Sequence, residues 1–145
     1  VETFKEVGRV RNLLMNKQKD FALNHAEEGL WTAARVHHFP TGGGFMVPHR
    51  DTMAPQLLQE VDSSYQYFQP ILVMSEKHKD FQTGGGVAMM NGQLVEYEDH
   101  CLFGDIAIYN VNTIHGVNEV DLNMPFVQRS SSGRFSGLVT LYKEI

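Results

Sequence analysis

The chain contains very little cysteine. Cys101 is the single copy, so no disulfide can form within the chain, and we expect a reducing, cytoplasmic environment. Runs of basic residues are also missing and the net charge is −5 at pH 7, which argues against a nucleic-acid or anionic-membrane partner. No stretch approaches the roughly 20 apolar residues that cross a bilayer, and the N-terminal residues lack the form of a signal peptide.

What the chain does contain is typical of one globular domain. Of its 145 residues, 42% are hydrophobic and 20% are charged, which are ordinary values for a protein with a buried core. Over residues 2–30, apolar side chains recur at helical spacing, and Gly29 is a typical stop signal. We therefore expect a single domain over 1–145, with a helical lead-in over 1–30 and the core over 31–145.

The core has the pattern of a β protein. Short segments rich in β-branched and aromatic residues alternate with clusters of Gly, Pro and Asp, and only Met53–Val61 has a helical pattern. Eight short strands in one domain predict a closed barrel or a jelly roll, in which the ends of distant strands meet. The expected strands are Trp31–Phe39, Gly44–Pro48, Tyr65–Met74, Val87–Met90, Gln93–Tyr97, Ile106–Val111, Gly116–Val120 and Phe135–Tyr142.

Two imidazoles and one carboxylate have the types and spacing of metal ligands. His49 and Asp51 face the same side of an extended strand, with Arg50 pointing away. Pro48 lacks a donor for the ladder, so we expect its strand to end there or to lie at a sheet edge. His115 follows an apolar strand later in the chain. Two His and one carboxylate are the ligand set of non-haem Fe(II) oxygenases; a hydrogen-bonded His–Asp pair without metal is the alternative.

The other histidines fit a metal site less well. His78 and Asp80 repeat the His-x-Asp spacing, but their neighbours are mostly charged, which favours a solvated turn. His37 and His38 are adjacent on a strand and point to opposite faces, so only one can face the interior. The histidines expected to be structural are His25 and His100.

A guanidinium and a hydroxyl lie near the C-terminus. Arg134 and Ser136 share one face if their segment is a strand. A guanidinium inside a barrel is costly unless it meets an anion, so we predict that Arg134 binds a ligand carboxylate in a fork-to-fork pair. The alternatives are Arg129 as the anchor, or pairing of Arg134 with a carboxylate of the chain such as Asp105 or Glu119.

The His-x-Asp pair, the later His and the Arg-x-Ser pair together resemble the Fe(II)- and 2-oxoglutarate-dependent dioxygenases. The segments Gln82–Gly86 and Phe103–Asn110 also resemble parts of that family. The resemblance covers about Trp31 to Tyr142, which is most of the chain. It implies a double-stranded β-helix core of the jelly-roll type.

The resemblance also implies an activity. His49, Asp51 and His115 would hold Fe(II), and Arg134 with Ser136 would bind the 5-carboxylate of the co-substrate 2-oxoglutarate. Reaction with O2 would oxidise a small organic substrate and release succinate and CO2. The ligand Asp51 favours hydroxylation over halogenation, since halogenating relatives carry a small residue in its place.

Two departures from the family pattern leave alternatives open. The gap between the second His and Arg134 is long, which keeps Arg129 as a candidate anchor, and little helix precedes the core. The alternative functions are a non-catalytic jelly-roll domain that binds a metal or a carboxylate, and a cupin-type metalloenzyme that does not use 2-oxoglutarate.

Overall fold

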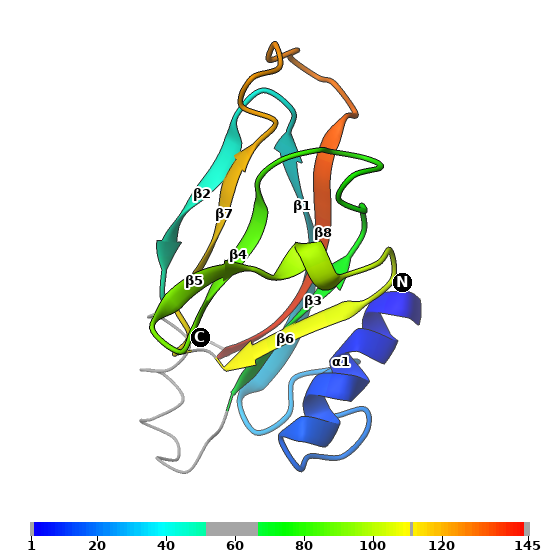
Figure 1. Cartoon of the computed structure of the whole chain (residues 1–145). Helices are drawn as coiled ribbons and strands as arrows, with labels where there is room; N and C mark the ends of the chain where they lie inside the picture. Colours follow the sequence, from blue (N-terminus) through cyan, green and yellow to red (C-terminus); the bar gives the residue numbers. More distant parts are fainter. Residues whose placement is uncertain (1, 52–66, 111, 144–145) are drawn as a thin grey trace.

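The computed structural model describes residues 2–51, 67–110 and 112–143. Within these residues, eight antiparallel strands form two four-stranded sheets, and one α-helix lies at the N-terminal end (Figure 1). The fold is therefore mainly β, as predicted. The elements are α1 (Glu2–Leu14), β1 (Leu30–Pro40), β2 (Gly44–His49), β3 (Phe68–Val73), β4 (Gly85–Met90), β5 (Gln93–Glu96), the 3-10 helix η1 (Tyr97–His100), β6 (Ile106–Asn110), β7 (His115–Val120) and β8 (Gly133–Lys143).

The predicted strands correspond one to one with β1–β8, and their ends differ by only a few residues. This agreement follows from the alternation of apolar and polar side chains, which is a local property of each strand. The short helix predicted over Met53–Val61 lies outside the described residues.

The N-terminal lead-in is helical only up to Leu14, so the prediction of helix over the rest of 1–30 is wrong. The side-chain amide of Asn12 donates to the carbonyls of Lys19 and Phe21, at 3.0 and 2.9 Å. These bonds hold the following residues in a turn, where Ala22 has a left-handed φ of 54°. Phe21 and Ala22 are nevertheless buried. Their apolar spacing thus reflects a loop packed on the core.

The two sheets have the orders β1-β8-β3-β6 and β2-β7-β4-β5. The pairs β1–β8, β2–β7, β3–β6 and β4–β5 are nested around the β4–β5 hairpin. At the tip of that hairpin, Asn91 and Gly92 have left-handed φ values of 50° and 81°, which a two-residue hairpin turn requires. Nested pairing places residues from opposite halves of the chain side by side.

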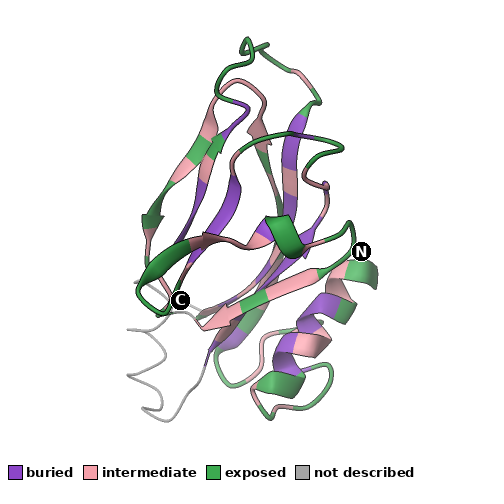
Figure 2. Ribbon diagram, in the orientation of Figure 1, coloured by how far each residue is buried: buried purple, intermediate pink, exposed green. Residues whose placement is uncertain are grey.

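Helix α1 covers the outer face of the sheet that contains β8. Val7 of α1 packs against Leu72 of β3 and Val139 of β8. A Cβ on Gly137 would lie 2.5 Å from the ring of Phe4, so this glycine permits the close approach of the helix. Figure 2 shows that β8 is buried along most of its length. Neither of the described helices is long and apolar enough to span a membrane.

Candidate metal site and cavity

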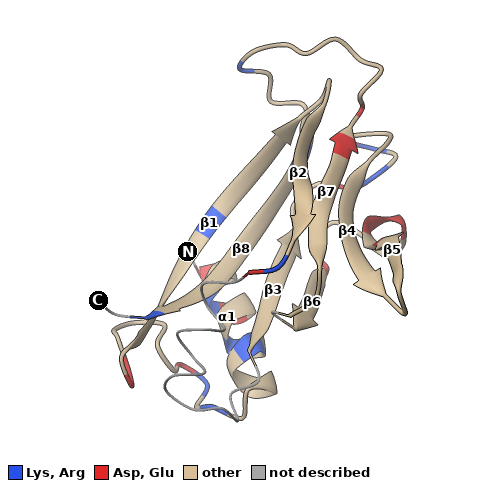
Figure 3. Ribbon diagram, turned by 90° about the vertical axis from the view of Figure 1, so that its left-hand side faces the viewer, with Lys and Arg blue, Asp and Glu red and all other residues tan. Residues whose placement is uncertain are grey.

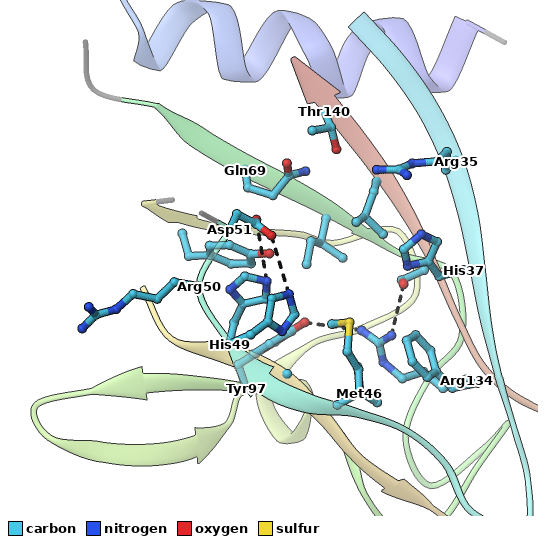
Figure 4. Close-up of a pocket in the computed structure, with 18 of the residues that line it drawn as sticks. Arg35, His37, Met46, His49, Arg50, Asp51, Gln69, Tyr97, Arg134 and Thr140 are labelled. Atoms are coloured by element: carbon cyan, nitrogen blue, oxygen red, sulfur yellow. Dashed lines mark hydrogen bonds and ion pairs between the residues drawn. The ribbon is translucent and has the colours of Figure 1, made fainter. Parts of the chain in front are cut away.

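A cavity of about 350 Å³ lies between the two sheets and is lined by residues of both. This volume is in the range of sites for small molecules. All five predicted site residues, His49, Asp51, His115, Arg134 and Ser136, line it. The close-up in Figure 4 shows Arg50 extending away from the histidines, as expected for a residue between two inward-facing neighbours.

The two histidines come from neighbouring strands. His49 ends β2, His115 begins β7, and the two residues are directly opposite each other in the antiparallel ladder. As predicted from Pro48, β2 is an edge strand and ends one residue later. A Cβ on Gly116 would lie 2.7 Å from a carbonyl oxygen of β2, so this glycine permits the close approach of the two strands.

Hydrogen bonds orient both imidazoles in the same way. Nδ1 of His49 lies 2.9 Å from the carbonyl oxygen of Val47, and Nδ1 of His115 lies 3.0 Å from that of Thr113. A carbonyl oxygen only accepts, so each neutral ring carries its hydrogen on Nδ1 and keeps the lone pair of Nε2 free. Such a bond to the backbone is the usual support of a metal-ligating histidine.

Asp51 completes the group. Its Oδ1 is 3.6 Å from Nε2 of His49 and its Oδ2 is 3.7 Å from Nε2 of His115. One ligand atom from each of the three residues lies within 4.8 Å of the other two. Ligands with bonds of roughly 2.1 Å at right angles are about 3 Å apart, so a shift of under about 1 Å would bring these atoms around one ion. The residues therefore fit a metal ion.

The second histidine is held more firmly than the first. The side chain of His115 is 6% exposed, against 40% for His49 and 35% for Asp51. The ring of Tyr109 stacks on His115 with 4.3 Å between ring centroids. Burial, and next the charge of Asp51, raise the pKa of Tyr109, so its phenol stays protonated beside the site.

At another part of the cavity, Arg134 is buried and already has a carboxylate partner. Its Nε donates to both oxygens of Glu98, at 2.8 and 2.9 Å, and its Nη2 lies 2.6 Å from Oε1. Its Nη1 donates to Oγ of Ser136 at 3.1 Å. Burial lowers the pKa of Arg134, but the hydrogen bonds that it donates to Glu98, the negative charge of Glu98 and the contacts with Tyr97 together outweigh this effect, so the pKa is raised. The arginine thus pairs with a carboxylate of the chain, although neither Asp105 nor Glu119 is the partner.

Sequence reasoning missed Glu98 and its neighbour Tyr97, which also lines the cavity. Two glycines of β4 make room for them. A Cβ on Gly85 would lie 2.6 Å from Oε2 of Glu98, and one on Gly86 would lie 2.2 Å from the hydroxyl of Tyr97. The amide of Gly86 also donates to Glu98 at 3.0 Å. The glycine run in the sequence indicates that another part of the chain packs closely against this strand, but it does not indicate which residues do so.

None of the competing residues belongs to the His49, Asp51 and His115 group. His78 and Asp80 are exposed in a turn, as predicted. His37 lines the cavity, whereas His38 stacks on Phe135. Arg129 is exposed on the segment between β7 and β8. Its position does not favour it as an anchor for a ligand in this cavity.

The arrangement can bind a divalent ion at one place and an anionic group at another, within one cavity between two sheets. Comparison with known proteins adds nothing to this description, since no family model, curated protein or solved structure matches the chain.

Proposed function

We propose that this protein is an Fe(II)- and 2-oxoglutarate-dependent oxygenase that oxidises a small organic molecule, most simply by hydroxylation, and releases succinate and CO2. The observation that carries the proposal is the convergence of His49, Asp51 and His115 in a cavity that also contains Arg134 and Ser136. Two imidazoles and one carboxylate on a metal leave coordination positions open, as the chemistry of such oxygenases requires.

The strand order supports a double-stranded β-helix of the jelly-roll type, which is part of the proposal. A long antiparallel ribbon that folds around its central hairpin pairs the first strand with the last and each inner strand with its counterpart. The pairs β1–β8, β2–β7, β3–β6 and β4–β5 follow that rule. In such a fold, the two ends of the ribbon line one interior.

In this proposal the side chains have separate tasks. His49, Asp51 and His115 hold the metal, and the Nδ1 bonds keep both Nε2 atoms available to it. Iron and 2-oxoglutarate together supply the activation of O2. Arg134 presents Nη1, and Ser136 its hydroxyl hydrogen, to the distal carboxylate of 2-oxoglutarate. Bulk water is excluded at the end of the cavity where Arg134 and Ser136 are buried.

One observation favours a second candidate, a metal-binding jelly-roll protein that does not use 2-oxoglutarate, either a cupin-type enzyme or a non-catalytic domain. Glu98 engages Nε and Nη2 of Arg134 and balances its charge. A guanidinium so paired attracts a further carboxylate less strongly than a free one. The oxygenase proposal therefore requires that Nη1 of Arg134 and the hydroxyl of Ser136 are enough to bind the distal carboxylate of 2-oxoglutarate.

Anaerobic titration separates these candidates. The protein is mixed with Fe(II) and then with 2-oxoglutarate, and the visible spectrum is recorded. Chelation of the metal by the co-substrate should produce a weak charge-transfer band in the native protein and none in a His115→Ala variant. Iron binding without any response to 2-oxoglutarate would instead support the second candidate.

A further inference from the structure

The cavity is also lined by polar residues that belong neither to the candidate metal ligands His49, Asp51 and His115 nor to the Arg134–Ser136 pair. Arg35 of β1 and Thr140 and Tyr142 of β8 line it. Figure 4 shows Arg35 and Thr140 near each other and away from Arg134, with His37 between the two arginines. Strand alternation explains the placement, because Arg35 and His37 are two residues apart on one face of β1.

Arg35 carries a charge that no carboxylate of the described chain balances within ion-pair distance. Its Nη2 donates to the hydroxyl of Tyr142, and its guanidinium carbon lies 5.4 Å from the centre of that ring. The strand ribbons carry few charged positions (Figure 3), and Arg35 is the one charged residue of β1. A guanidinium held by a phenol keeps most of its donors for an anion.

The hydroxyl of Thr140 provides a second, independent observation. Its Oγ1 is buried and has no hydrogen-bond partner among the residues that the structure describes. A buried hydroxyl without a partner is costly, and a ligand oxygen in the cavity would satisfy it. The pKa of His37 agrees with positive charge along this wall of the cavity, because burial, and then the charges of Arg35, which is itself exposed, and of Arg134, lower it.

We propose that Arg35, with the hydroxyls of Thr140 and Tyr142, forms a carboxylate subsite for the organic substrate, separate from the Arg134 end of the cavity. The substrate is then a small carboxylic acid that binds through its carboxylate and directs the rest of its chain into the cavity. This assignment of a substrate class rests on the proposed oxygenase function, whereas the carboxylate subsite itself does not.

Calorimetry with a matched pair of probes tests the subsite. Native protein, saturated anaerobically with Mn(II) and 2-oxoglutarate, is titrated with hexanoate and with hexanamide, which differ in charge and hardly in size. Hexanoate should bind at least about tenfold more tightly, because its carboxylate meets the guanidinium in charge-assisted bonds.

Arg35→Gln should remove this preference, Arg35→Lys should retain part of it, and Thr140→Val should weaken hexanoate binding several-fold. The control is Arg129→Gln, on the exposed segment between β7 and β8, which should change nothing.

The outcomes separate the two proposals. Hexanoate binding that is unchanged in Arg35→Gln, with an unchanged thermal midpoint, would overturn the subsite. Loss of 2-oxoglutarate binding in Arg35→Gln but not in Arg134→Ala would also overturn it, because Arg35 would then be the co-substrate anchor. If metal and 2-oxoglutarate fail to bind while hexanoate still depends on Arg35 in the metal-free protein, the subsite stands and the oxygenase function fails. Inorganic phosphate that displaces hexanoate at equal concentration would contradict the assignment to carboxylates.

Discussion

Glu98 and Arg134 form a buried ion pair across the interior, with two Nε bonds at 2.8 and 2.9 Å and a third contact from Nη2 at 2.6 Å. Both side chains are almost fully buried, at 3% and 2% exposure. The amide of Gly86 donates to the same carboxylate. This pairing keeps the guanidinium charged although it is buried. It also orients Arg134 so that Nη1 donates to Ser136 on the cavity side.

Loss of Glu98 should destabilise the fold strongly. A Glu98→Ala variant leaves the charge of Arg134 buried without a partner, which costs about 3–5 kcal/mol of the free energy of unfolding. Urea denaturation measures this loss. The double variant Glu98→Leu, Arg134→Met removes both charges and should recover much of the stability. If the free energy of unfolding falls in the double variant by the sum of the losses in the Glu98→Leu and Arg134→Met single variants, the two residues are not coupled.

Arg134 should control the affinity for 2-oxoglutarate and not the affinity for metal. Truncating one partner of a desolvated charge pair costs roughly 2–5 kcal/mol, so Arg134→Ala should weaken 2-oxoglutarate binding by about 30-fold or more. Lys should restore the affinity only in part, because a point charge lacks the planar fork. Equilibrium titration gives the constants, with Arg129→Ala as the control. A large effect at Arg129 and none at Arg134 would reverse the assignment of the anchor.

The strands and the shared face of His49 and Asp51 were predictable because their signals are local. His49 and Asp51 are two residues apart, and strand geometry alone places them on one face. His115 lies beside them because β2 pairs with β7. The expectation of a closed β fold allows this pairing but does not specify which strands are neighbours. Pro48 correctly indicated an edge strand and its end.

The remaining features depend on contacts between distant parts of the chain. Glu98 lies 36 residues before its partner Arg134, and nothing near either residue distinguishes this carboxylate from Asp105 or Glu119. The turn after Leu14 depends on side-chain bonds of Asn12 to backbone carbonyls. Apolar spacing cannot tell such a packed turn from a helix.

Metal binding should require all three ligands. Replacing His49, Asp51 or His115 by Ala removes one donor of the group, so Mn(II) or Fe(II) affinity should fall by at least about tenfold in each variant. Isothermal titration under anaerobic conditions measures it. His78→Ala is the matched control, because this histidine also precedes an aspartate by two residues but lies in an exposed turn. If His78→Ala loses metal and the other variants keep it, His78 and Asp80 bind the ion instead of His49 and Asp51.

His37 should make the fold less stable in mild acid. Its pKa is lowered by burial and by the charges of Arg35 and Arg134, so the unfolded chain binds a proton more readily than the folded chain does. Stability is then fully present above about pH 6.5 and declines as the pH falls toward the folded pKa. In His37→Gln this contribution is missing, so denaturant titrations at several pH values should give a shallower decline. Parallel declines in native protein and variant would contradict the lowered pKa.

Metal affinity itself should fall steeply with acid, because protons compete with the ion for both imidazoles. Well below the ordinary histidine pKa of about 6.5, displacement of two protons would weaken binding by up to about 100-fold per pH unit, and displacement of one by about 10-fold. Mn(II) titrations of the native protein between neutral and mildly acidic pH measure this slope. The His49→Ala variant, which retains His115, should bind more weakly at neutral pH but lose affinity less steeply. A native affinity that stays flat over this range would show that the two imidazoles, although directly opposite each other on β2 and β7, do not bind the ion together.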